Sequence, residues 1–206
     1  MPRCVLVGGA GIQTYARVNR ILRPDDYFVF CDGGLHHLPY LNAAPDLIVG
    51  DFDSHERPDT AVETIVLPRE KDDTDSVYAA REAVRRGFDD FLLLGAAGGR
   101  LDHTLGNISL LLWLDGQGKS AKILDDFSEM EIVSSREKTI DSSFSYFSLL
   151  NISGTARGIR ITGAKYPLAD GEISCEYQYG ISNEVLPGGT AAVSVREGRL
   201  LLIRVF

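Results

Sequence analysis

The segment that most constrains the fold of this chain is an apolar run ending in acidic residues, at positions 46–54. Residues 47–49 are Leu, Ile and Val, a run typical of a buried strand in a parallel sheet. Gly50 permits a sharp turn after the strand, and Asp51 and Asp53 follow. Open α/β sheets bind ligands beyond the carboxyl ends of their strands. The segment therefore predicts a ligand site built on a parallel sheet.

Two further acidic segments predict the same kind of site. Asp32 ends a second apolar run at 28–31, and three of the five residues at 71–75 are aspartates. If these carboxylates converge, each pair repels by roughly 4 kcal/mol at about 4 Å and an effective dielectric constant near 20, so the group needs a cation. Oxygen ligands favour Mg²⁺ or Mn²⁺, and Mg²⁺ usually keeps substrate phosphates in its remaining positions. The pattern predicts phosphate chemistry.

Composition argues against several classes of partner. The chain has 206 residues, an apolar content of 44% and a net charge of −8. No run of Lys and Arg is interleaved with aromatic residues, so we expect neither nucleic acid nor an anionic membrane as a partner. No stretch of 18 apolar residues predicts a membrane span, and a cytoplasmic location is the default expectation. The spacing of the three cysteines predicts neither a disulfide nor a zinc site.

Residues 1–127 alternate between strand and helix patterns. Runs typical of strands occur at 4–7, 27–31, 47–49, 64–67, 91–94 and 121–124. Helical patterns lie between several of these runs, and one of them begins near Asp75 and stops at Gly87. This alternation predicts an α/β domain in which a mostly parallel sheet has flanking helices.

Two glycine-rich turns are candidate phosphate sites. Gly98, Gly99 and Arg100 precede a predicted helix, where main-chain N–H groups can approach a phosphate and the guanidinium can add two hydrogen bonds. The turn at 8–11 lacks the lysine of a P-loop and the third glycine of a dinucleotide fingerprint. For that turn, a phosphate contact and a simple strand-to-helix turn are equally good interpretations.

Helical geometry predicts where the two adjacent histidines and the single tryptophan lie. His36 and His37 are adjacent, so on a helix they point about 100° apart, and we expect them at the surface or at the edge of a cleft. Trp113, the single tryptophan, lies in a helix pattern that predicts a core position.

From about residue 127 the pattern changes to short strands. Such runs occur at 130–133, 144–150, 156–162, 173–179, 191–195 and 200–206, with Gly, Ser, Asn and Pro turns between them. The change predicts a smaller all-β sandwich domain over residues 128–206. Its small core suggests that it packs against the first domain or another subunit.

These motifs, taken in order, resemble the thiamine pyrophosphokinase (thiamine diphosphokinase) family over nearly the whole chain. The matching segments are 31–34, 45–54, 71–75, 95–103 with Asn107, 163–168 and 180–184. The resemblance implies an α/β nucleotide domain followed by a β-sandwich, and a homodimer with active sites between subunits. It implies ATP as co-substrate, Mg²⁺ as cofactor, and transfer of a diphosphoryl group to the hydroxyl of thiamine, giving thiamine diphosphate and AMP.

The resemblance also assigns roles to residues of this sequence. The magnesium ligands would be Asp51, Asp53 and Asp75, and these with Asp72 form the predicted catalytic set. ATP and its phosphates would contact Asp32, Gly33, Lys71, Thr74, Gly98, Gly99, Arg100, Asp102, His103 and Asn107. Thiamine would contact Ser182 and Asn183 in the sandwich.

Some alternatives stay open. Asp73 can cap a helix rather than bind metal, and Ser182 with Asn183 can form an ordinary turn. An aromatic face could stack on the rings of the thiamine cation, but for Tyr177 and Tyr179 a structural position in the sandwich is a better interpretation than this contact. The competing functions are another Mg²⁺-dependent nucleotide diphosphokinase or hydrolase of the same fold, and a non-catalytic thiamine or nucleotide sensor.

Overall fold

The computed structural model describes residues 1–53, 57–68, 70 and 72–206 of the chain. Contacts between residues divide the chain into two compact units, residues 1–126 and 127–206. Among the helices in the described ranges, none has both the length and the apolar character that a membrane crossing requires.

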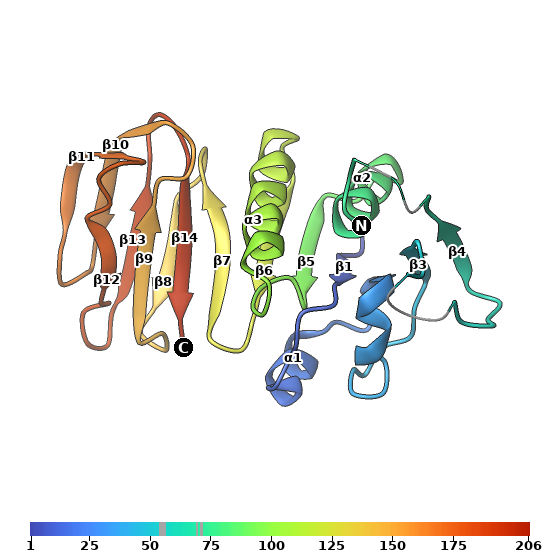
Figure 1. Cartoon of the computed structure of the whole chain (residues 1–206). Helices are drawn as coiled ribbons and strands as arrows, with labels where there is room; N and C mark the ends of the chain where they lie inside the picture. Colours follow the sequence, from blue (N-terminus) through green and yellow to red (C-terminus); the bar gives the residue numbers. More distant parts are fainter. Residues whose placement is uncertain (54–56, 69, 71) are drawn as a thin grey trace. The chain divides into compact units, whose positions relative to one another are not determined.

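Among the described residues of the first unit, six parallel strands are hydrogen-bonded in the order β6, β5, β1, β2, β3, β4 (Figure 1). Their bounds are β1 Cys4–Val7, β2 Tyr27–Cys31, β3 Leu47–Gly50, β4 Glu63–Val66, β5 Asp90–Leu94 and β6 Ser120–Leu124. All residues of β1, β3 and the last four of β5 are buried. Continuous apolar runs suit these positions because central parallel strands are covered on both faces.

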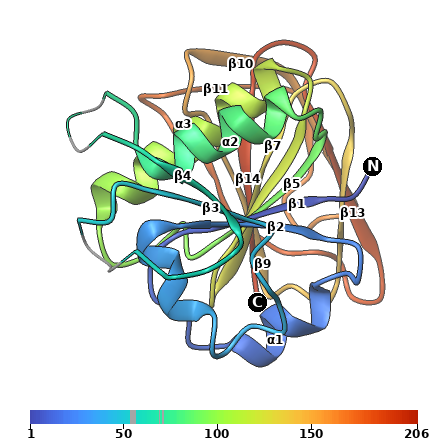
Figure 2. The ribbon, with the colours of Figure 1, turned by 90° about the vertical axis from the view of Figure 1, so that its right-hand side faces the viewer.

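In the part of this unit that the structure describes, three α-helices and one 3₁₀ helix accompany the sheet. They are α1 (Tyr15–Ile21), η1 (Asp32–His37), α2 (Asp75–Arg85) and α3 (Leu101–Gly116). Figure 2 shows α2 and α3 on one face of the sheet and α1 on the other. The buried face of α2 includes Ala79, Ala80 and Ala83, and such small side chains let this helix pack closely on β1, β2 and β3.

Asp126, the last residue of the first unit, anchors the start of α1. Its carboxylate accepts the main-chain N–H of Gln13 at 2.9 Å, the N–H of Thr14 at 2.7 Å and the Thr14 hydroxyl. Arg17 donates to the Asp126 carbonyl at 2.7 Å. Burial favours the neutral acid, yet the hydrogen bonds from Thr14 and Gln13 hold the pKa of Asp126 below its usual value. The carboxylate is therefore ionised at neutral pH and holds the two residues that lead into this short helix.

The second unit is a sandwich of two antiparallel groups of strands. One group has the order β12, β9, β14, β7 and the other the order β11, β10, β13, β8. The bounds are β7 Ser128–Val133, β8 Lys138–Asp141, β9 Tyr146–Leu150, β10 Thr155–Thr162, β11 Leu168–Ser174, β12 Gly180–Asn183, β13 Thr190–Ser194 and β14 Leu200–Val205. Alternate residues from both groups, such as Phe147, Ile159 and Leu202, form the core between them.

Three expectations about the fold need correction. The mostly parallel sheet holds for the first unit alone; over the whole chain the pairing is mixed, because strands after residue 127 pair antiparallel. The strand expected at 173–179 is broken, since Tyr177 donates its N–H to the Ser174 carbonyl in a turn. Trp113 is partly buried rather than in the core, with the Arg81 guanidinium 5.8 Å from its ring centroid.

Candidate active site

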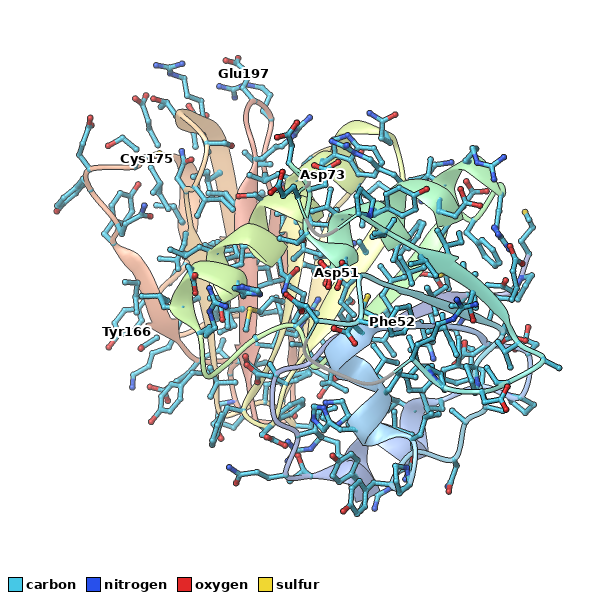
Figure 3. The ribbon with its side chains drawn as sticks, turned by 45° about the vertical axis from the view of Figure 1, so that its right-hand side comes forward. Asp51, Phe52, Asp73, Tyr166, Cys175 and Glu197 are labelled. Atoms are coloured by element: carbon cyan, nitrogen blue, oxygen red, sulfur yellow. The ribbon has the colours of Figure 1, made fainter. Side chains whose placement is uncertain are left out.

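Three aspartates meet at the carboxyl edge of the parallel sheet. One oxygen each from Asp32, Asp51 and Asp75 lies within 4.8 Å of the others. Asp32 follows β2, Asp51 follows β3, and Asp75 is the first residue of α2. Figure 3 shows Asp51 in the segment after β3. Three elements that are separate in the sequence thus build one group of carboxylates, called the aspartate triad below.

The register of the sheet explains why Asp32 and Asp51 meet. Cys31 of β2 pairs with Val49 of β3, so the residues that follow these two positions leave the sheet side by side. A Cβ atom on Gly50 would lie only 2.7 Å from the Cβ of Asp32. Glycine is therefore required at this position because it makes room for the Asp32 side chain, which is 1% exposed.

The start of α2 provides the third carboxylate in a favourable electrostatic setting. The Thr74 hydroxyl caps the helix and accepts the N–H of Val77 at 3.4 Å. Asp75 lies in the first turn, where the helix dipole stabilises a negative charge. That effect offsets part of the repulsion within the triad, and a cation would offset the rest.

The geometry of the triad suits a hard divalent cation. An octahedral Mg²⁺ with bonds of about 2.0–2.1 Å places neighbouring ligand atoms roughly 3 Å apart and opposite ones about 4 Å apart. The three oxygens, up to 4.8 Å apart, could reach these distances through small side-chain movements. Their chemistry also fits, since all three ligands are carboxylate oxygens.

The other acidic residues of the predicted site lie differently. Among the described carboxylates, Asp53 is not part of the triad; it is exposed, and its N–H donates to Asp51 Oδ1 at 3.2 Å. Asp72 is also exposed, whereas Asp73 pairs with Arg81. Direct or water-mediated metal binding by Asp53 stays a prediction. Lys71 lies outside the described residues.

From its place after an apolar run, Asp32 was grouped with the converging carboxylates, whereas the family resemblance assigned it to the nucleotide contacts. A usable signal was present, because Asp32 and Asp51 both follow a buried apolar strand. The sequence does not show that those two strands are adjacent in the sheet. Only the pairing of β2 with β3 brings the two strand ends together.

The turn between β5 and α3 is exposed at residues 98–100, where Arg100 forms an ion pair with the start of α3. Gly98 and Gly99 have φ angles of 96° and 65°, which favour glycine. Arg100 pairs with Asp102 at 2.6 Å, and both side chains are exposed. This hydrogen bond from the guanidinium lowers the pKa of Asp102 to about 2. An exposed pair of this kind is weak, so Arg100 can exchange Asp102 for a phosphate.

Two of the residues predicted to contact nucleotide hold this loop in shape. The Gly98 N–H donates to Thr104 Oγ1 at 3.1 Å. Asn107 is buried, and its Nδ2 donates to the Ala96 carbonyl at 2.7 Å. His103 is exposed in the first turn of α3. The structure therefore gives Asn107 a structural contact within the loop, while Gly99 and His103 lie at its exposed surface.

The turn at 8–11 and the residues after β2 pack against each other closely. A Cβ on Gly9 would lie 3.3 Å from the Cα of Gly33, and a Cβ on Gly34 would lie 2.0 Å from the Val7 carbonyl oxygen. Main chain therefore packs directly on main chain at this edge of the sheet. This arrangement supports the interpretation of the 8–11 glycines as a tight turn.

His37 differs from its expected surface position. It is fully buried, with Nδ1 2.7 Å from the Tyr15 hydroxyl and Nε2 3.0 Å from the Ala10 carbonyl oxygen. Burial, together with the neighbouring His36, lowers the pKa of His37 to about 4. A neutral imidazole thus links the 8–11 turn to α1. The prediction failed for His37 because Tyr15 and Ala10 supply partners for its buried ring; His36, its neighbour in the same 3₁₀ helix, is exposed as expected.

The second unit contains a pocket of about 110 Å³. Its wall is formed by Ile161, Tyr166, Pro167, Leu168, Tyr179, Gly180, Ile181 and Asn183. The Tyr166 side chain projects from the ribbon and is 60% exposed (Figure 3). Of the two tyrosines weighed from the sequence, Tyr179 lines this pocket, and Tyr177 is not among its lining residues.

The two predicted thiamine contacts differ in exposure. Ser182 is exposed and has a φ of 58°, and its N–H donates to Ser148 Oγ at 3.0 Å. Asn183 is 4% exposed. Its Oδ1 accepts the N–H groups of Tyr166 and Glu184 at 3.0 and 2.9 Å, and its Nδ2 donates to the Tyr166 carbonyl at 2.8 Å.

Comparisons with known proteins agree with this division of the chain. Residues 18–124 match the family model of the thiamin pyrophosphokinase catalytic domain, and residues 130–200 match that of the thiamin pyrophosphokinase vitamin B1 binding domain. A thiamine pyrophosphokinase of Bacillus subtilis is 31% identical over 163 residues, which are 75% of this chain and 76% of that protein.

Solved structures give the same result. A crystal structure of thiamine pyrophosphokinase from Bacillus subtilis has a TM-score of 0.85 and 26% identity, with 100% of this chain and 99% of that chain covered. One from Geobacillus thermodenitrificans has a TM-score of 0.83 and 30% identity, with 99% and 97% covered. On these matches and on the motifs placed above, the chain belongs to the thiamine pyrophosphokinase family.

Proposed function

We propose that the chain transfers the diphosphoryl group of ATP to the hydroxyl of thiamine at the aspartate triad, giving thiamine diphosphate and AMP. The observation that carries this proposal is the meeting of Asp32, Asp51 and Asp75 within 4.8 Å, in a chain whose two parts match the catalytic and vitamin B1 binding domains of this family. Neither a different acceptor nor a non-catalytic sensor is favoured by these matches. A cytoplasmic location stays a prediction.

Mg²⁺ would be held by the three carboxylates of the triad, with Asp53 and Asp72 as further ligands, direct or through water. When bound, the ion neutralises phosphate charge and polarises the transferred group. The support for this assignment is the ligand chemistry and the spacing of the three oxygens.

The chain's own residues would orient the reactants. Arg100 would leave Asp102 and bind a phosphate of ATP, next to the exposed main chain of Gly99, and Lys71 is predicted to add a second positive charge. The thiamine hydroxyl oxygen attacks the β-phosphorus, and the bond from this phosphorus to the oxygen bridging to the α-phosphorus breaks. AMP leaves with that oxygen, while the hydroxyl proton passes to a carboxylate of the triad.

Thiamine would enter the pocket of the second unit. Thiamine is a cation with flat aromatic rings, and a tyrosine face attracts such a group. Tyr166 and Tyr179 line the pocket, and the exposed Ser182 lies beside it in β12. Tyr166 is therefore our candidate for the ring that stacks on thiamine.

We also propose a homodimer with active sites between subunits. In the second unit Tyr177, Ile181 and Leu186 are each about half exposed or more. Exposed apolar side chains grouped on so small a unit are typical of an interaction surface. Sedimentation equilibrium should then give a mass of about twice 22.6 kDa, and a monomer at micromolar concentration would contradict the proposal.

A phosphorus NMR time course with ATP, MgCl₂ and thiamine tests the reaction. We expect AMP and thiamine diphosphate in equal amounts, and neither when thiamine is left out. ADP with thiamine monophosphate would overturn the proposal. Asp51→Asn should lose both products, whereas Asp25→Asn, a change at an exposed aspartate, should keep them.

A further inference from the structure

One residue that lines the pocket of the second unit, Tyr166, is not fixed in place by burial. The Tyr166 ring is 60% exposed, so packing alone does little to fix its direction. The ring is attached to the turn between β10 and β11, residues 163–167. Whatever orients this turn therefore orients the ring.

The Asn183 side chain holds the main chain of Tyr166 at two points. Its Oδ1 accepts the Tyr166 N–H at 3.0 Å, and its Nδ2 donates to the Tyr166 carbonyl at 2.8 Å. Oδ1 also accepts the Glu184 N–H at 2.9 Å. Both acceptor positions of the amide oxygen are used, and one Nδ2 hydrogen is left. This side chain has little hydrogen-bonding capacity for a ligand.

A bulge in β12 directs Asn183 toward this turn. Gly180 pairs with Leu149 and Asn183 with Phe147, so three steps along β12 oppose two along β9. Ser182 takes up the extra residue, with a φ of 58°. Bulges of this kind re-aim side chains, and here the following residue, Asn183, is 4% exposed.

Further bonds join the same two segments. The Lys165 N–H donates to the Glu184 carbonyl at 2.9 Å, and the Leu186 N–H donates to the Gly163 carbonyl at 3.0 Å. Lys165 Nζ lies 2.6 Å from a Glu184 carboxylate oxygen and 5.7 Å from the Tyr166 ring centroid. The turn is thus fastened to residues 183–186 at Gly163 and Lys165 as well as at Tyr166 itself.

We infer that Asn183 is a positioning residue: it fixes the Tyr166 ring as a wall of the thiamine pocket and sets affinity for thiamine through that ring. This inference rests on the proposed function and changes the role expected for Asn183 from a ligand contact to a support. Ser182, by contrast, keeps an exposed hydroxyl for the ligand.

A double-mutant cycle separates support from direct contact. Thiamine binding to the full chain is measured by titration calorimetry for wild type, Asn183→Ala, Tyr166→Ala and the double variant. We expect Asn183→Ala to weaken binding about tenfold in the wild-type background and less than about twofold in the Tyr166→Ala background. Additive effects would mean that Asn183 contacts thiamine itself and would overturn the inference.

A second variant and a structural readout guard against simple unfolding. Asn183→Asp keeps the two acceptor bonds but sets an oxygen against the Tyr166 carbonyl, so it should weaken thiamine binding while the chain still folds. Amide exchange of Tyr166 should speed up in Asn183→Ala, which removes the acceptor of the Tyr166 N–H, and unchanged exchange in that variant would sink the inference. Wild-type chain that fails to bind thiamine would overturn the proposed function and the inference with it. Normal wild-type binding with unaffected Asn183 variants would overturn the inference alone.

Discussion

The aspartate triad and the pocket of the second unit are built in different ways. The triad lies at the ends of two paired parallel strands and at the first turn of a helix, so regular hydrogen bonding fixes its position. The pocket depends on a bulge, a turn and the amide of Asn183. The sheet therefore fixes one site, and side chains bonded to main chain fix the other.

Replacing one carboxylate of the triad should strongly lower the rate of the reaction. Asp32→Asn is expected to lower kcat at least about 100-fold, since it removes a charge at the reacting phosphates. Because repulsion inside the triad falls, the free energy of unfolding should stay equal or rise. Initial rates and thermal unfolding check both points. Asp53→Asn provides the comparison: a loss as large as that of Asp32→Asn would show that the exposed carboxylate is an equal ligand.

Gly50→Ala tests whether the sheet sets the triad. The new Cβ would lie 2.7 Å from the Asp32 Cβ, so we expect a loss of about 1–3 kcal/mol in the free energy of unfolding. Gly106 of α3 has open space around it, and Gly106→Ala should instead stabilise the helix by up to about 1 kcal/mol. Urea unfolding measures both. Equal free energies of unfolding for Gly50→Ala and Gly106→Ala would show that the Cβ at position 50 meets no steric obstacle.

Acid should weaken the first unit through His37. Its pKa falls from about 6.5 in the unfolded chain to about 4 in the folded one, so the unfolded state binds the proton first. Stability is complete above pH 6.5 and declines as the pH falls toward 4, by about 3 kcal/mol in total. Urea unfolding at pH 7, 6 and 5 gives the slope, which His37→Gln should flatten. Parallel slopes in both proteins would contradict this origin.

The smallest effect concerns the ion pair in the exposed β5–α3 loop. If Asp102 competes with phosphate for Arg100, Asp102→Asn should lower the KM for ATP by about threefold, because the exposed pair is weak. Steady-state kinetics at fixed thiamine concentration measure it. A higher KM would instead support the nucleotide contact predicted for Asp102 from the family resemblance.

The different construction of the triad and the pocket also explains how much of each could be predicted from the sequence. Asp51 was found because an apolar run followed by glycine and aspartate is a local pattern. The partnership of Asp51 with Asp32 needed the pairing of β2 with β3, which local patterns do not contain. Asn183 was found only as part of a family motif, and its bonds to Tyr166 depend on a bulge between strands distant in the sequence. His37 looked exposed because burial of a polar ring requires partners that only the fold supplies.

Because Asp126 anchors the start of α1, it limits where the chain can be truncated. The match to the catalytic family model stops at residue 124, two positions short of this carboxylate. A fragment ending there would leave the N–H groups of Gln13 and Thr14 without their acceptor, and Arg17 without its carbonyl. A fragment boundary drawn from sequence similarity would therefore loosen a helix more than 100 residues away along the chain, and extension through Asp126 would preserve it.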